Sequence, residues 1–202
     1  ITFLIIGFCL GLCSGFAIPV AQRFGSRDYK ELRRFIGNAV WLCVGFGFVL
    51  TVLTVIFCRN ILELMGTPAD IIDDAYAYLV VIFAGIPATF LYNMLAGIQR
   101  AIGDSRMPLY VLIVCCLANV VLDLLFVVVF HWGVFGVAFA TILSQLISAV
   151  LLMIRLMGTQ EAYRVELRKI RFHKDILKNV VRIGLPAGLQ SVMYSFSNIL
   201  IQ

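Results

Sequence analysis

Long apolar runs separated by short polar connectors make up the chain. The apolar runs predict five membrane-spanning helices and the start of a sixth, over residues 1–21, 38–58, 75–98, 109–130, 134–154 and 183–202. About 20 apolar residues are enough for an α-helix to cross the hydrocarbon core of a bilayer. The pattern therefore predicts an all-α polytopic membrane protein. Because the chain begins inside one apolar run and ends inside another, we expect it to be a piece of a longer protein.

The composition supports a membrane protein and excludes an ordinary soluble domain. Of the 202 residues, 62% are hydrophobic and only 13% are charged. A typical soluble domain has about 45 to 50% apolar and about 25% charged residues, so this chain has too little polar surface to cover a globule in water. The net charge of +5 could indicate a nucleic-acid partner. The basic residues lie in the gaps between apolar runs, however, so we expect the lipid bilayer and no nucleic acid as a partner.

The basic residues are distributed unevenly among the connectors. Of the 16 Lys and Arg residues, 15 lie in the first, third and fifth connectors, and only Arg59 lies in the second. Positive charge concentrates on the cytoplasmic side of membrane proteins, so those three connectors are predicted to be cytoplasmic. The polar stretches 22–37 and 155–182 are further predicted to form helices on the membrane surface.

The run from Leu109 to Phe130 contains a single charged residue, Asp123. A charged side chain at the centre of a membrane helix costs on the order of 2.5 to 3.5 kcal/mol, and such residues usually have a function. Asn119 precedes Asp123 by one helical turn, which places the two side chains on the same face of a helix. We therefore interpret this pair as the centre of a candidate site.

Thr141 is expected to face this pair from the next predicted helix. Only residues 131–133 separate the two runs, so the helices must be antiparallel neighbours. At about 1.5 Å per residue, Asp123 and Thr141 both lie roughly 10 Å below the outer surface. The oxygen atoms of the three side chains suit a small cation such as Na⁺, and the carboxylate alone could take up a proton. The alternative is a structural role, in which Asp123 only holds helices together through Asn119 and Thr141.

Other features of the runs concern helix packing. Pro87 lies near the middle of the run 75–98 and predicts a helix kink. Gly7, Gly11 and Gly15 recur every four residues, a spacing that lets a neighbouring membrane helix approach closely. The six cysteines lie in or beside apolar runs without C-x-x-C spacing, so we expect them to be free thiols.

Sequence motifs of catalysis and of cofactor binding are absent. The chain has no H-E-x-x-H string, no Gly-rich phosphate loop and no ligand-spaced cluster of Cys and His. Both histidines, His131 and His173, lie in connectors. We therefore expect no enzymatic activity, no cofactor and no metal centre other than a possible Na⁺ at Asp123.

Several strings resemble those of the multidrug and toxic-compound extrusion (MATE) transporters. The segments 91–109 (LYNMLAGIQRAIGDSRMPL), 117–127 (LANVVLDLLFV) and 133–145 (GVFGVAFATILSQ) are similar to the fourth to sixth helices of that family. Residues 15–34 resemble the second helix and its following loop, and residues 183–202 resemble the start of the seventh. The resemblance covers essentially the whole chain.

The resemblance implies a twelve-helix antiporter built from two six-helix lobes. Residues 1–158 would form helices 2 to 6 of the amino-terminal lobe, 159–182 the cytoplasmic connector between the lobes, and 183–202 the start of helix 7. Such a protein exports cationic amphiphilic compounds in exchange for Na⁺ or H⁺, needs no cofactor, and is expected as a monomer in the bacterial-type plasma membrane.

The resemblance also implies a cation site in the amino-terminal lobe. The family places an Asp on the first helix, an Asn and an Asp on the fifth and a Thr on the sixth, and Asn119, Asp123 and Thr141 match the last three. The first-helix Asp would lie before Ile1, and Asn93 on the fourth helix is a further candidate.

Two other functions stay open. One is a lipid-linked oligosaccharide flippase of the same superfamily, although none of the spans has the basic residues that a pyrophosphate needs. The other is a non-transporting membrane scaffold.

Overall fold

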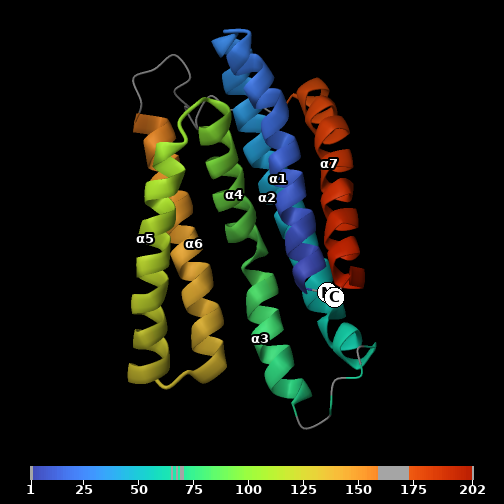
Figure 1. Ribbon diagram of the computed structural model, residues 1–202, viewed down its shortest axis with the longest axis vertical. Coiled ribbons are helices and arrows are strands. Elements are labelled where there is room, and N and C mark those ends of the chain that lie inside the picture. Colours follow the sequence, from blue (N-terminus) through green and yellow to red (C-terminus); the bar gives the residue numbers. More distant parts are fainter. Residues whose placement is uncertain (1, 65, 67, 69–70, 159–172, 202) are drawn as a thin grey trace.

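The computed structural model describes residues 2–64, 66, 68, 71–158 and 173–201, and all regular elements among them are helices (Figure 1). In chain order they are α1 (Thr2–Gly25), α2 (Tyr29–Leu64), α3 (Ile72–Ala84), α4 (Ile86–Ala101), α5 (Arg106–Asp123), the π-helix η1 (Leu124–Val129), α6 (Gly133–Gly158) and α7 (Lys174–Ile201). Five helical segments are long and apolar enough to cross a membrane: Ile6–Gly25, Tyr29–Leu64, Ile72–Ala101, Arg106–Val129 and Gly133–Gly158. The predicted class, an all-α polytopic membrane protein, is confirmed.

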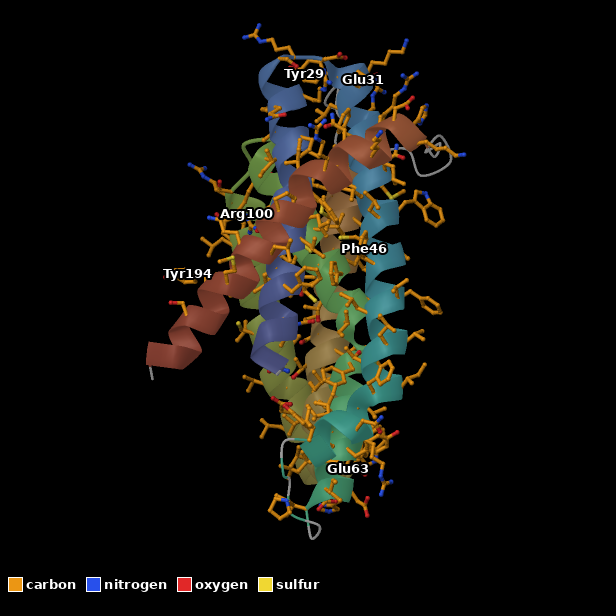
Figure 2. All side chains as sticks on the ribbon, turned by 90° about the vertical axis from the view of Figure 1, so that its right-hand side faces the viewer. Tyr29, Glu31, Phe46, Glu63, Arg100 and Tyr194 are labelled. Atoms are coloured by element: carbon orange, nitrogen blue, oxygen red, sulfur yellow. The ribbon has the colours of Figure 1, made fainter. Side chains whose placement is uncertain are left out.

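Successive spans run in alternate directions along the bundle. Figure 1 shows the turns after α1 and after α4 at one end and the α5–α6 hairpin at the other. Tyr29 and Glu31 mark the first of these ends and Glu63 marks the opposite end (Figure 2). The first and third connectors therefore share one end of the bundle, as an alternating arrangement requires.

The prediction of a separate surface helix over residues 22–37 is wrong. α1 continues to Gly25, only residues 26–28 form the turn, and α2 begins at Tyr29. Arg27 adopts a left-handed φ of 59°, and the Asp28 carboxylate accepts a hydrogen bond from the Glu31 N–H at 3.1 Å. The polar residues thus form the ends of two long helices, because one tight, capped turn is enough to reverse the chain.

The last helix also begins earlier than expected. α7 starts at Lys174 rather than at Ile183, so part of the stretch 155–182 belongs to this helix. The N–H of His173 donates a hydrogen bond to Asn38 Oδ1 at 3.0 Å, which ties the start of α7 to α2. Residues 155–158 of the predicted surface helix belong to the end of α6, and residues 159–172 lie outside the described residues.

The core of the bundle lies between α1, α2, α4, α6 and α7. Its largest fully buried side chains include Leu12 and Phe16 on α1 and Phe90 and Met94 on α4. α1 packs more extensively against α7 than against any other helix, and Figure 2 shows α7 crossing it obliquely. At the crossing, a Cβ atom built on Gly15 would lie 2.6 Å from the Gly184 Cα atom. Glycine at position 15 therefore permits the close helix approach that the four-residue spacing of Gly7, Gly11 and Gly15 predicts.

Candidate functional site

The site predicted from the sequence lies between α5 and α6, which are antiparallel neighbours joined by a short hairpin. The Asn119 Nδ2 atom donates a hydrogen bond to Thr141 Oγ1 at 3.5 Å, and the Thr141 hydroxyl donates to the Val137 carbonyl at 3.0 Å. Both side chains are half-buried. The structure thus brings Asn119 and Thr141 together across the two helices.

Asp123 is the last residue of α5 and lies one turn beyond Asn119. Its Oδ1 atom is buried and accepts no hydrogen bond within the described part of the chain. The ion pairs found there join Arg34 to Glu31 and Arg59 to Glu63 and Asp73, so none involves Asp123. An unsatisfied buried acceptor costs about 1 to 3 kcal/mol, and more when it is charged. The chemistry of this atom fits a proton or a small cation.

A π-helix follows Asp123 directly. Residues Leu124–Val129 form this wider helix, and at its end the Phe130 N–H donates to the Leu125 carbonyl at 3.1 Å, five residues back. π-helical turns are rare and often occur at functional sites. The sequence does not predict this feature, because the aliphatic run carries no residue that marks a change of helix type.

A cluster of aromatic rings holds the connected ends of α5 and α6 at the hairpin. Phe126 is 7% exposed and stacks on Trp132 with ring centroids 5.1 Å apart and an interplanar angle of 8°. Phe139 on α6 meets the same Phe126 ring edge-on at 5.4 Å. A Cβ atom on Gly136 would lie 3.0 Å from the Phe126 Cβ atom, so the two helices are in close contact here. The cluster fixes the ends of α5 and α6 relative to each other, and with them the levels of Asp123 and Thr141.

A second polar contact joins α4 to α6 and was not anticipated from the sequence. The Thr89 hydroxyl donates a hydrogen bond to Gln145 Oε1 at 2.5 Å. Gln145 follows Thr141 by one turn, so both side chains share a face of α6. The sequence carries one signal for this contact: Gln145 is an amide within the apolar run 134–154, one turn from the predicted site residue Thr141.

Asn93 is placed differently from the other candidates. Its Nδ2 atom donates to the Thr89 carbonyl at 2.8 Å, a hydrogen bond within α4. Within the described residues, no hydrogen bond joins Asn93 to Asp123, Asn119 or Thr141. Asn93 therefore lies beside the α4–α6 contact rather than in the Asn119–Thr141 pair.

The span that contains Pro87 is divided at Gly85 into α3 and α4, and Pro87 lies in the first turn of α4. Proline has no N–H to donate to the carbonyl four residues earlier. That carbonyl, of Phe83, instead accepts a hydrogen bond from the Thr51 hydroxyl of α2 at 3.0 Å. A Cβ atom on Gly85 would collide with the Ile142 side chain of α6. The break is therefore supported by α2 on one side and fits against α6 on the other.

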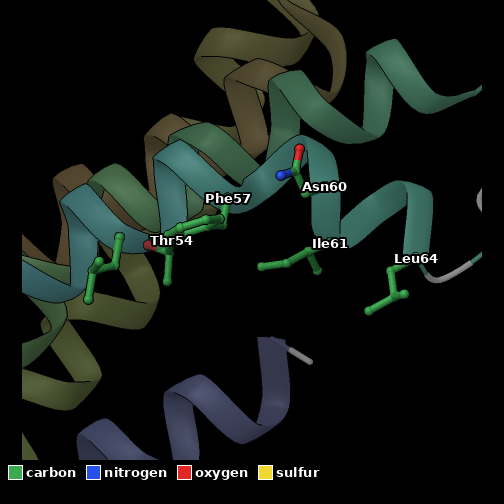
Figure 3. Close-up of a pocket in the computed structure, with 6 residues that line it drawn as sticks. Thr54, Phe57, Asn60, Ile61 and Leu64 are labelled. Atoms are coloured by element: carbon green, nitrogen blue, oxygen red, sulfur yellow. The ribbon is translucent and has the colours of Figure 1, made fainter.

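Two apolar hollows lie on the surface of α2, separate from this site. One, of about 410 Å³, is lined by Leu53, Thr54, Phe57, Asn60, Ile61 and Leu64 (Figure 3). The other, of about 340 Å³, is lined by Trp41, Leu42, Gly45, Phe46, Val49 and Leu177. Neither contains a charged side chain, so neither is suited to hold a cation.

Comparisons with known proteins identify the family. A model of the MatE family matches residues 1–125. The chain is 31% identical to the probable multidrug resistance protein YoeA of Bacillus subtilis (strain 168), over 98% of this chain and 44% of that protein. It is 22% identical to the multidrug export protein MepA of Staphylococcus aureus (strain NCTC 8325 / PS 47), over 100% of this chain and 46% of that protein.

Solved structures match the fold over almost the whole chain. The outward-facing conformation of a multidrug resistance MATE family transporter of the MOP superfamily matches with a TM-score of 0.88 and 26% identity, over 98% of this chain and 44% of that one. An inward-facing conformation of such a transporter matches with a TM-score of 0.86 and 26% identity, over 96% and 44% of the two chains. The chain thus spans less than half the length of the relatives it matches. On the family match and the shared fold, the chain belongs to the MatE family of multidrug and toxic-compound extrusion (MATE) transporters.

Proposed function

We propose that the whole protein is a cation-coupled antiporter that exports cationic amphiphilic compounds, and that this chain carries its coupling site. The relatives named multidrug resistance and multidrug export proteins support export as the activity. Within the proposed protein, residues 1–158 belong to the amino-terminal lobe, 159–182 connect the lobes, and 183–202 begin the second lobe. We expect a monomer in the bacterial plasma membrane.

The observation that carries the coupling site is the buried Oδ1 atom of Asp123, which lacks a hydrogen-bond partner in the described part of the chain. A carboxylate kept out of water without a partner gains more from a bound cation or proton than an exposed carboxylate does. Binding and release of that positive charge therefore changes the stability of the state in which Asp123 is enclosed. This dependence is what couples an ion gradient to a conformational change.

Asn119 and Thr141 supply the neutral oxygens of the proposed site. Asn119 uses its nitrogen to donate to Thr141, which leaves Asn119 Oδ1 available as a ligand. The Thr141 hydroxyl donates its proton to Val137 and accepts from Asn119, so its oxygen keeps one further lone pair for a ligand. One carboxylate with neutral oxygens suits Na⁺, whereas the carboxylate alone is sufficient for H⁺. These donors therefore fit both ions, and experiment is needed to distinguish Na⁺ from H⁺ as the coupling ion.

In the proposed cycle, ion binding and drug binding favour different openings of the two lobes. Rocking of one half of a transporter against the other exposes a site near the middle of the membrane alternately to the two sides. The close crossing of α1 and α7 at Gly15 and Gly184 lies where the proposed lobes meet. Asp123 is on α5, in the proposed lobe that also contains α1. In this proposal, the binding or release of a cation at Asp123 therefore acts on the α1–α7 crossing through contacts within a single lobe.

The test is drug efflux by the full-length protein with Asp123→Asn, in vesicles with an imposed Na⁺ or pH gradient. We expect the variant to lose gradient-driven efflux of a fluorescent cationic dye, because the neutral amide cannot exchange a positive charge. Glu63→Gln is the matched control, since this carboxylate lies at the exposed end of α2, and its efflux should equal that of the unmodified protein.

The two gradients distinguish the coupling ions. Efflux driven by Na⁺ at constant pH indicates Na⁺, and efflux driven by a pH gradient without Na⁺ indicates H⁺. Unchanged, gradient-dependent efflux in Asp123→Asn would refute the proposed role of Asp123.

A further inference from the structure

A pair of buried thiols lies where α1, α2 and α4 meet, on helices other than those that carry Asp123 and Thr141. Cys13 Sγ and Cys43 Sγ are 3.8 Å apart, and they lie 3.6 and 3.8 Å from the Phe90 carbonyl oxygen. Cys13 is 2% exposed and Cys43 is fully buried. Two soft sulfur ligands on adjacent helices thus contact each other beside one backbone carbonyl.

We propose that Cys13 and Cys43 form a binding site for a soft, divalent cation that prefers two ligands, of the Hg²⁺ class. Thiolates select soft metal ions over hard ones. The proposed site is independent of the coupling site, because its ligands come from α1 and α2 and those of the coupling site come from α5 and α6.

The separation of the sulfur atoms suits a metal bridge better than a disulfide. Metal–thiolate bonds of about 2.3 Å, the value for zinc, give a linear bridge of about 4.6 Å between the sulfurs. The thiols, 3.8 Å apart, would have to separate by only about 0.8 Å. A disulfide requires an S–S distance of about 2.05 Å, so they would have to approach by roughly 1.8 Å. In a close-packed interior the smaller movement is favoured.

Charge and coordination number select the class of metal. Two S–H bonds break and two Hg–S bonds form, and both protons leave to water, so no oxidant is needed. The product, one Hg²⁺ with two thiolates, is neutral and avoids the cost of a net charge inside the membrane. A monovalent soft ion with two thiolates would leave a negative charge. Zinc requires four ligands, and no group of three or more metal-ligating side chains occurs among the described residues.

The experiment measures mercury that resists removal by a monothiol. The full-length protein, carrying Cys115→Ala and Cys116→Ala to remove the two more exposed thiols, is incubated with HgCl₂ and then washed with excess glutathione. Mercury held by one thiol exchanges onto glutathione, whereas mercury chelated by two protein thiols is retained. Bound mercury is then quantified by mass spectrometry, and circular dichroism verifies that each variant is folded.

We expect this protein to retain one equivalent of mercury more than its Cys13→Ala and Cys43→Ala variants. Cys9→Ala is the matched control, because Cys9 is an equally buried thiol one turn from Cys13 on α1, and it should retain mercury fully. Equal retention with and without Cys13 or Cys43 would overturn the proposal. Loss of the retained equivalent in Cys9→Ala would also overturn it, since the site would then use a different pair of sulfurs.

Discussion

The crossing of α1 and α7 leads to the sharpest test of the fold. Replacing Gly15 by Ala adds a methyl group where a Cβ atom would lie 2.6 Å from Gly184 Cα and 2.8 Å from Ala187 Cβ. Carbon atoms in favourable contact are about 3.5 to 4.0 Å apart, so the helices must separate by roughly 1 Å. The nearest atom belongs to backbone, which cannot rotate away. We therefore expect overpacking to cost about 1 to 3 kcal/mol.

Gly45→Ala on α2 provides the control, because nothing lies within 4 Å of the added methyl group. Both substitutions gain about 1 kcal/mol of intrinsic helix stability, so this contribution cancels when the two variants are compared. The midpoint of thermal unfolding in detergent should be lower for Gly15→Ala than for Gly45→Ala. If Gly15→Ala is as stable as Gly45→Ala, α1 and α7 do not approach as closely as the structure shows.

Two further predictions concern the break in the third span and the aromatic cluster. Thr51→Val keeps the shape of the side chain but leaves the Phe83 carbonyl without its hydroxyl donor, so it should cost about 1 to 3 kcal/mol in detergent unfolding. Thr54→Val removes a hydroxyl that bonds only within α2 and should cost less; equal losses would contradict the supporting role of Thr51. Phe126→Ala removes the buried ring of the hairpin cluster and should destabilise by about 3 kcal/mol or more, measured in the same way. Phe130→Ala, at a ring that is 48% exposed, should have a clearly smaller effect, and the reverse order would contradict the proposed packing.

The spans and the main polar pair could be predicted because their signals are local. Apolar runs of membrane length define the helices, and the short connector at 131–133 forces α5 and α6 to be neighbours. From that adjacency alone, Asn119 and Thr141 could be expected to meet, and their side chains are hydrogen-bonded in the structure.

Features that depend on packing between distant segments could not be predicted. The Thr89–Gln145 hydrogen bond requires the relative rotation of α4 and α6, which no spacing in the sequence specifies. The ends of helices were also misjudged, since a polar stretch such as 22–37 can equally well form a surface helix or extend two long ones. Asp123 illustrates both limits. Its burial follows from hydropathy, but its place at the junction with a π-helix does not.

The π-helix changes how the chain between Asp123 and the hairpin responds to the loss of a residue. A π-helical turn holds one residue more than an α-helical turn, so the removal of one aliphatic residue from the segment 124–129 can be absorbed by a return to the α-helical form. In a regular α-helix such as α5, by contrast, the removal of one residue turns everything beyond it by about 100°. The segment thus holds one spare residue directly beside Asp123, and the loss of that residue would restore the α-helix without turning Asp123 relative to the hairpin.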